Sequence, residues 1–136
     1  MAGPSPDLLR STALFADLDD ATLAHLASDF IPRDFPEGAV LAEEGKGGLN
    51  FFVVESGEAA VSVGGTTVGT IGPGQSFGEI ALVDKSARSA TITATSEMRT
   101  YALPVWSFRS FVETRPDVSW RLLEILADRL RAAEAR

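Results

Sequence analysis

Cysteine is absent from this chain of 136 residues, and histidine occurs only once, as His25. Without cysteine the chain has no disulfide framework and no thiolate chemistry, which fits a reducing compartment. One histidine does not provide the several histidine ligands of a metal-dependent β-roll enzyme, so we expect no metal site and no cofactor. The sequence also has no recognisable grouping of nucleophile, base and acid. We therefore expect a protein that is not an enzyme.

Long apolar runs and an excess of positive charge are absent too. No run reaches the roughly 20 apolar residues that a membrane-spanning helix needs, and the first residues, MAGPSPDLLR, lack the basic and apolar regions of a secretory signal. These features predict a cytoplasmic protein that does not enter a membrane through this chain. The net charge of −7 argues against nucleic acid as a partner, because surfaces that bind DNA or RNA are rich in lysine and arginine.

What remains is the composition of an ordinary globular domain. Hydrophobic residues make up 45% of the chain and charged residues 23%, and the length suffices for one domain, 1–136, with its own core. Near the N-terminus, the stretch DLLRSTALFADLDDATLAHLAS has apolar residues at helical spacing, with Asp19 or Asp20 in place to cap a helix. We expect two short helices within residues 5–29.

Residues 30–104 have the pattern of an antiparallel β-roll. Short runs rich in β-branched and aromatic residues alternate with turns that contain glycine, such as Gly64-Gly65 and Gly72-Pro73-Gly74. Such regular spacing favours a roll or sandwich of antiparallel strands. The fold class predicted is therefore mostly β with flanking helices, a jelly-roll-like β-roll. The predicted strands are AVLAE, NFFVVE, EAAVSV, TTVGTI, SATITAT and MRTYAL.

After Pro104 the apolar spacing becomes helical again. VWSFRSFVETR predicts one helix, and Pro116 stands where the first turn of a second helix tolerates proline. Apolar residues recur in the second helix at intervals of three or four, which predicts one apolar stripe. The stripe consists of Val118, Leu122, Ile125, Leu126, Leu130 and Ala133.

The stretch GQSFGEIALVDKSARSATITA, residues 74–94, interrupts the strands. Glu79 follows a Phe-Gly pair, and Arg88 comes nine residues later among small residues. We expect a short helical turn between Ser76 and Leu82 and a new strand that starts at Arg88. Amides at the start of such a turn and a guanidinium opposite them form a pocket for one phosphate, while Glu79 can accept a hydrogen bond from a nearby hydroxyl. A cyclic nucleotide has this phosphate, a free sugar hydroxyl and an apolar base.

FGEIALVDKSARSATITA resembles the phosphate-binding cassette of cyclic-nucleotide-binding domains, the family found in catabolite activator proteins, the regulatory subunit of protein kinase A and cyclic-nucleotide-gated channels. The resemblance covers nearly the whole chain and places the cassette at 76–91. It implies that Glu79 binds the ribose 2′-hydroxyl and that the last helices, within 105–136, form a hinge and a lid. The residues that it implies around the ribose and the phosphate are Gly78, Glu79, Ile80, Ala81, Arg88, Ser89 and Ala90.

Two features depart from the family pattern. Ala87 stands where a proline often precedes the arginine, and matching the lid helix puts Arg129, Ala133 and Glu134 at the positions over the base. Hydroxyl residues occupy two of these positions in some bacterial members, so the choice between cyclic AMP and cyclic GMP stays open, with cyclic AMP favoured. The helix-turn-helix domain of the transcription-factor members has no counterpart in these 136 residues.

Two function classes follow from the sequence. In the first, the chain is a regulatory module that binds cyclic AMP or cyclic GMP and signals by moving its C-terminal helices. We then expect the apolar stripe of the last helix to pack on the roll and the base in the closed state with ligand, and its end to be less well held without ligand. In the second, it keeps the fold, binds nucleotide weakly or not at all, and uses its C-terminal helices to form a homodimer or to contact an effector domain. The apolar side chains available for this contact are Trp106, Phe108, Phe111, Trp120 and Leu123.

Overall fold

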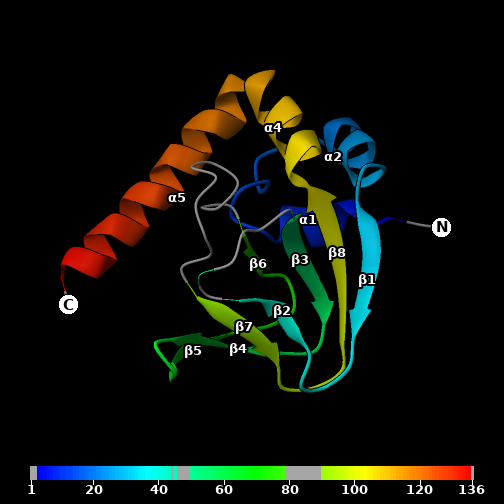
Figure 1. The fold of residues 1–136 in the computed structure, drawn as a ribbon. Helices are drawn as coiled ribbons and strands as arrows, with labels where there is room; N and C mark the ends of the chain where they lie inside the picture. Colours follow the sequence, from blue (N-terminus) through cyan, green and yellow to red (C-terminus); the bar gives the residue numbers. More distant parts are fainter. Residues whose placement is uncertain (1–2, 44, 46–49, 79–89, 136) are drawn as a thin grey trace.

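Two four-stranded antiparallel sheets form a roll, and helices cover one end of it (Figure 1). The computed structural model describes residues 3–43, 45, 50–78 and 90–135. The first sheet has the strand order β1-β8-β3-β6 and the second β2-β7-β4-β5. The strands are β1 (Ile31–Phe35), β2 (Val40–Ala42), β3 (Asn50–Ser56), β4 (Ala59–Val63), β5 (Thr66–Ile71), β6 (Ser76–Phe77), β7 (Thr91–Ala94) and β8 (Met98–Pro104).

The helices come from the two ends of the chain. Those before the roll are α1 (Pro6–Arg10) and α2 (Asp20–Ala27), and those after it are α4 (Val105–Glu113) and α5 (Pro116–Glu134). Asp19 caps α2, because its carboxylate accepts a hydrogen bond of 2.7 Å from the backbone amide of Thr22. Hydrogen bonds from the side chain and the backbone amide of Thr22 lower the pKa of Asp19 below its usual value. Pro116 is the first residue of α5, as its missing amide hydrogen allows.

β3 is buried on both faces and separates two apolar cores. Phe51 and Val53 point into a core shared with the helices, whereas Phe52 and Val54 point into the interior of the roll. Successive side chains of a strand face opposite sides, so a continuous apolar run is needed here. In the helical core, the ring of Phe51 stacks on that of Phe108 of α4, with centroids 5.3 Å apart.

The predicted fold class is confirmed, and each of the six predicted strands has a counterpart. Two strands, β1 and β6, were not among the predicted runs. β6 corrects one prediction, because Ser76 and Phe77 are paired with β3 and do not begin a helical turn. β7 is also shorter than SATITAT, since Ala90 lies in a bend and the strand begins at Thr91.

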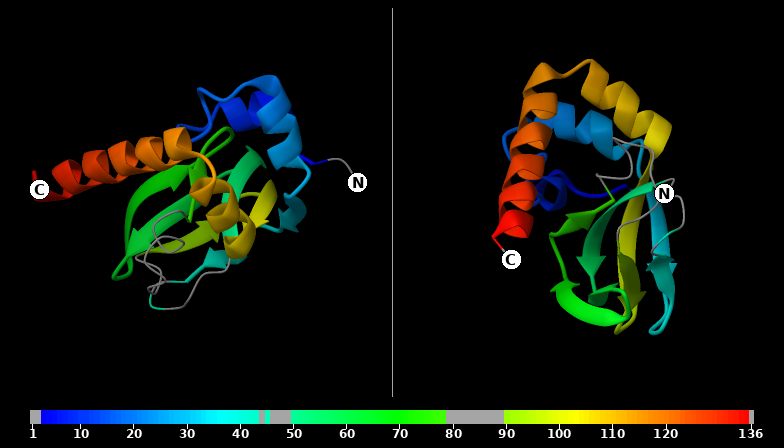
Figure 2. Two further views of the ribbon diagram at one scale, coloured as in Figure 1. Left: turned by 90° about the horizontal axis from the view of Figure 1, so that it is seen from above. Right: turned by 60° about the vertical axis from the view of Figure 1, so that its left-hand side comes forward.

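The apolar stripe of α5 packs on the molecule over only half its length. Val118 and Leu122 are buried, and Ile125 and Leu126 pack against the same core. Leu130, however, is 61% exposed, and Ala133 is exposed as well. Only the first half of the stripe packs here, because the last turns of α5 extend past the end of the core (Figures 1 and 2). That the whole stripe packs in a closed state with ligand stays a prediction. No helix among the described residues has the length and apolar character to cross a bilayer.

Candidate functional site

The strand that leads into the predicted cassette is held firmly. Phe77 is 6% exposed, and its ring stacks on Phe52 with centroids 5.0 Å apart and planes at 18°. The next residue, Gly78, has a φ of +105°. This region of backbone conformation strongly favours glycine. A residue with a side chain would be strained at the position that follows β6.

A turn at residues 72–75 fixes where β6 starts. The amide of Gly74 donates to the carbonyl oxygen of Val54 over 2.9 Å, and the amide of Val54 donates to the carbonyl oxygen of Gln75 over 2.9 Å. The side-chain oxygen of Gln75 accepts from the amide of Gly72 over 2.7 Å. The backbone ahead of the cassette is therefore tied to β3 in the middle of the roll.

The far end of the cassette joins the other sheet. Ala90 is half-buried and leads into β7, where Ile92 and Ala94 are buried inside the roll. Ala94 exchanges backbone hydrogen bonds of 2.8 Å with the segment ahead of β2, at Gly38 and Ala39. The cassette thus runs from an edge strand of one sheet to an inner strand of the other, and both of its ends are fixed.

Five of the predicted ligand-binding residues lie outside the described residues: Glu79, Ile80, Ala81, Arg88 and Ser89. Gly78 and Ala90, at the two ends, are described. Their contacts to a ligand remain predictions.

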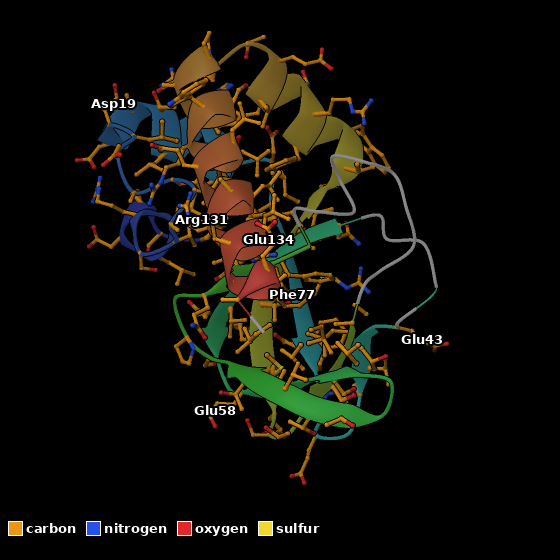
Figure 3. The ribbon with its side chains drawn as sticks, turned by 90° about the vertical axis from the view of Figure 1, so that its left-hand side faces the viewer. Asp19, Glu43, Glu58, Phe77, Arg131 and Glu134 are labelled. Atoms are coloured by element: carbon orange, nitrogen blue, oxygen red, sulfur yellow. The ribbon has the colours of Figure 1, made fainter. Side chains whose placement is uncertain are left out.

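The predicted lid residues lie along the outer half of α5. Arg129 borders a cavity of about 310 Å³ whose other walls include Gln75 and Ser76, the residues just before Gly78. Ala133 and Glu134 lie about one turn further along and are exposed. Figure 3 shows Glu134 on the last turn of α5, in front of the roll that holds Phe77. The structure thus brings Arg129 beside the start of the cassette and leaves the other two lid residues in solvent.

A side-chain hydrogen bond joins α4 and α5 across the hinge. The hydroxyl of Ser119 donates to the carbonyl oxygen of Val112 over 2.8 Å, which links the first turn of α5 to the end of α4. Phe108 is 3% exposed, so it cannot contact a partner, whereas Phe111 is half-buried, packs against the helical core and also borders a surface hollow. This corrects the place of Phe108 in the predicted contact surface.

The remaining members of that surface are exposed. Trp106 and Trp120 are each 66% exposed, and Leu123 is 56% exposed. Trp106 borders a second, larger hollow of about 630 Å³ between α2 and α4, which His25 also lines. The described residues include no group of three or more histidine, aspartate and glutamate side chains suited to a metal ion.

Comparison with known proteins identifies the family to which this chain belongs. The family model of the cyclic nucleotide-binding domain matches residues 32–115, a range that includes strands β2 to β8, the predicted cassette and α4. The chain belongs to the cyclic nucleotide-binding domain family.

Two curated relatives and one solved structure illustrate the similarity. A CRP-like cAMP-activated global transcriptional regulator of Mycobacterium tuberculosis is 30% identical over 130 residues, which cover 92% of this chain and 58% of the relative. A cGMP-dependent protein kinase of Eimeria tenella is 41% identical over 91 residues, 67% of this chain and 9% of the kinase. The catabolite activator protein of Thermus thermophilus superposes with a TM-score of 0.82 at 30% identity, over 90% of this chain and 60% of that one.

The chain therefore spans less than two thirds of each of these proteins. The similarity covers one domain of these proteins and does not extend to the rest of their chains.

Sequence reasoning missed the contacts that fix the cassette ends and the N-terminal segment that touches α5. The Phe-Gly pair in the sequence could have indicated both the buried ring of Phe77 and the positive φ of Gly78. No signal in the sequence indicated the 3.0 Å hydrogen bond between Arg121 of α5 and the backbone of Ala13, because the two residues are 108 positions apart.

Proposed function

We propose that this chain binds a cyclic nucleotide, with cyclic AMP favoured, and signals by moving α5. The observation that carries the proposal is the shared cavity at the start of the cassette, where Arg129 of the lid helix lies beside Gln75 and Ser76. A ligand held by the cassette would be within reach of the helix that has to respond to it. Family membership supports the same conclusion.

The resemblance assigns each site residue a role in this proposal. Glu79 accepts a hydrogen bond from the ribose 2′-hydroxyl, and Arg88 pairs with the cyclic phosphate. The other proposed ligand-binding residues are Gly78, Ile80, Ala81, Ser89 and Ala90, and the proposed base lid is Arg129, Ala133 and Glu134. Binding is the whole activity proposed, without a catalytic step.

Binding calorimetry with cyclic AMP and cyclic GMP tests the proposal. We expect one ligand per chain and an affinity in the micromolar range, about 8 kcal/mol. Arg88→Leu should weaken binding about 30- to 1000-fold, or roughly 2 to 4 kcal/mol, because the phosphate loses its charged partner. A folded Arg88→Leu protein with unchanged affinity would refute the phosphate role.

A second substitution tests the ribose contact. Glu79→Ala should cost about 1.5 to 3 kcal/mol of binding free energy, the range for a hydrogen bond to a charged group. The loss should disappear with 2′-deoxy cyclic AMP, which has no hydroxyl to donate. If Glu79→Ala still preferred the ribo form as strongly as the wild type does, the contact would belong to another residue.

Selectivity between the two nucleotides depends on the lid. Guanine offers two adjacent donors at its outer edge, which a carboxylate such as Glu134 suits. Its exposed place on the last turn limits what this contact contributes. We expect both nucleotides to bind, with cyclic GMP within about tenfold of cyclic AMP. Competition titrations of wild type and Glu134→Ala check this, and a preference above a hundredfold that Glu134→Ala leaves unaltered would contradict the lid assignment.

A second candidate function is self-association through the outward face of α5. Trp120, Leu123 and Leu130 are exposed, and their spacing of three and seven residues matches one seam of a paired helix. We propose a second copy of the chain as the partner. Sedimentation equilibrium of wild type and Leu123→Glu tests it: a dimer that Leu123→Glu dissociates is expected, whereas a monomer at all concentrations would leave this face to an effector domain.

A further inference from the structure

A bend at residues 11–13, between α1 and α2, touches the lid helix directly. The guanidinium of Arg121 donates its Nε hydrogen to the carbonyl oxygen of Ala13 over 3.0 Å. The bend itself is firmly placed, because Thr12 is 1% exposed and its hydroxyl donates to the carbonyl oxygen of Leu9 over 2.7 Å. Arg121 therefore fastens the inner half of α5 to a rigid point.

The same bend touches the turn ahead of the cassette. The hydroxyl of Ser11 lies 2.5 Å from the carbonyl oxygen of Leu8, its nearer acceptor, and 3.3 Å from that of Gly74. Gly74 has a φ of +82°, and a Cβ on it would lie 3.1 Å from this hydroxyl oxygen. The backbone of the turn thus approaches the bend as closely as glycine permits, four residues before Gly78.

The space between these contacts is partly empty. The cavity of about 310 Å³ is bordered by the bend, by Gly74 and by Ile125 and Arg129 of α5. Beyond Leu126 the side chains of α5 are exposed. The outer half of α5 therefore has little packing to hold it. Its direction is set at the inner half, where Val118 and Leu122 are buried and Arg121 bonds to Ala13.

We propose that Arg121 is a positioning residue that holds α5 in the arrangement seen here, with Leu130 exposed, and that the bend at 11–13 links α5 to the turn ahead of the cassette. This proposal rests on the proposed function, in which a bound nucleotide draws α5 toward the cassette. A ligand shifts a helix only through contacts that differ between its two positions. A bond made only in the outward position opposes binding, and its removal raises the apparent affinity.

Arg121→Met tests this, since it keeps the length and helical preference of the side chain but removes the donor. We expect the variant to bind cyclic AMP two- to tenfold more tightly, which is about 0.4 to 1.4 kcal/mol, the usual net contribution of a hydrogen bond. Without nucleotide, amide hydrogen exchange over residues 122–134 should be faster than in the wild type. Ser11→Ala should change the affinity in the same direction by a smaller factor, because its nearer acceptor is Leu8.

Arg131→Met is the matched control. Arg131 lies on the same helix, and Arg131→Met makes the same change of charge, but Arg131 pairs with Asp128 on the exposed surface (Figure 3). Its affinity should stay within twofold of the wild type. Glu124→Gln removes the negative charge of the side chain that lies 3.5 Å from the Arg121 NH1 group and leaves the Ala13 bond in place, so it too should bind as the wild type does.

The outcomes separate this proposal from the proposed function. Affinity that is unchanged or lower in a folded Arg121→Met protein overturns the positioning role, as does unchanged exchange in α5. If the wild type binds neither nucleotide, the proposed function fails, and exchange measured without nucleotide still decides whether Arg121 fastens the helix.

Discussion

Two leucines of α5 differ in burial and allow a matched test of where the lid helix packs. Leu122 is 6% exposed in the core shared by the helices and β3, whereas Leu130 on the same helix is 61% exposed. Leu→Ala removes the same atoms at both positions, and alanine favours a helix at least as well as leucine does. Any difference in cost therefore reports the packing.

The expected magnitudes follow from the burial. Leu122→Ala takes away three carbon atoms, at about 0.8 kcal/mol each for transfer, and leaves a cavity, so the free energy of unfolding should fall by about 2 to 5 kcal/mol. Leu130→Ala should change it by no more than about 0.5 kcal/mol, as for other surface positions. Urea unfolding of both variants, followed by far-ultraviolet circular dichroism, measures the two values.

The same pair tests the proposed signal. If a cyclic nucleotide draws the outer half of α5 onto the roll, Leu130 becomes buried only in the bound state, and Leu130→Ala should weaken nucleotide binding while the stability without ligand stays the same. Equal losses of stability in the two variants would refute the half-packed helix. Wild-type affinity in Leu130→Ala would show that Leu130 gains no contact when the nucleotide binds.

Three further perturbations have defined outcomes. Gly57→Ala should lower the free energy of unfolding by at least about 2 kcal/mol, because Gly57 has a φ of +87° and a Cβ on it would overlap the carbonyl oxygen of Glu97. Gly64→Ala should cost clearly less, because a Cβ at that position would have no neighbour within 4 Å, and equal costs would contradict the clash. Asp19→Ala should destabilise the protein at neutral pH. Because hydrogen bonds from the side chain and the backbone of Thr22 lower the pKa of Asp19, this difference in stability should vanish as the pH falls well below 3.8; a loss that persists in acid would point to packing. Burial raises the pKa of Tyr101 above its usual value of 10. The neutral hydroxyl therefore contributes stability that is present below pH 10 and is lost as the pH rises through the pKa of the folded state. Unfolding measured above pH 10 should show this loss of stability in the wild type and not in Tyr101→Phe.

Local signals in the sequence determined most of the fold and the family. The apolar run NFFVV at 50–54 predicted a strand, the turns at Gly64-Gly65 and Gly72-Pro73-Gly74 separated its neighbours, and the spacing from Val118 to Leu126 predicted a helix. Each of these signals depends on residues a few positions apart. The identity of the family followed from the cassette motif for the same reason, since its glycine, acidic and basic residues lie within one short stretch.

Other features depended on contacts that no local pattern contains. β1, with proline and two charged residues in IPRDF, has little strand signal of its own, and β6 is only two residues long; both exist because β8 and β3 offer them partners. The extent of α5 packing was decided in the same way. Leu126 and Leu130 look alike in the sequence, but the core formed by the N-terminal helices, β3 and α4 reaches only the first.

The sequence by itself thus determined the fold class, six of the strands and the family, because short-range periodicity and motif spacing carry that information. Only the tertiary structure decided which strands pair across the two sheets, how far the lid helix is supported, and that Arg121 meets Ala13 across 108 residues of chain. Contacts of this kind depend on where the chain brings distant segments together, and hydrophobic spacing along the sequence does not specify a single long-range partner.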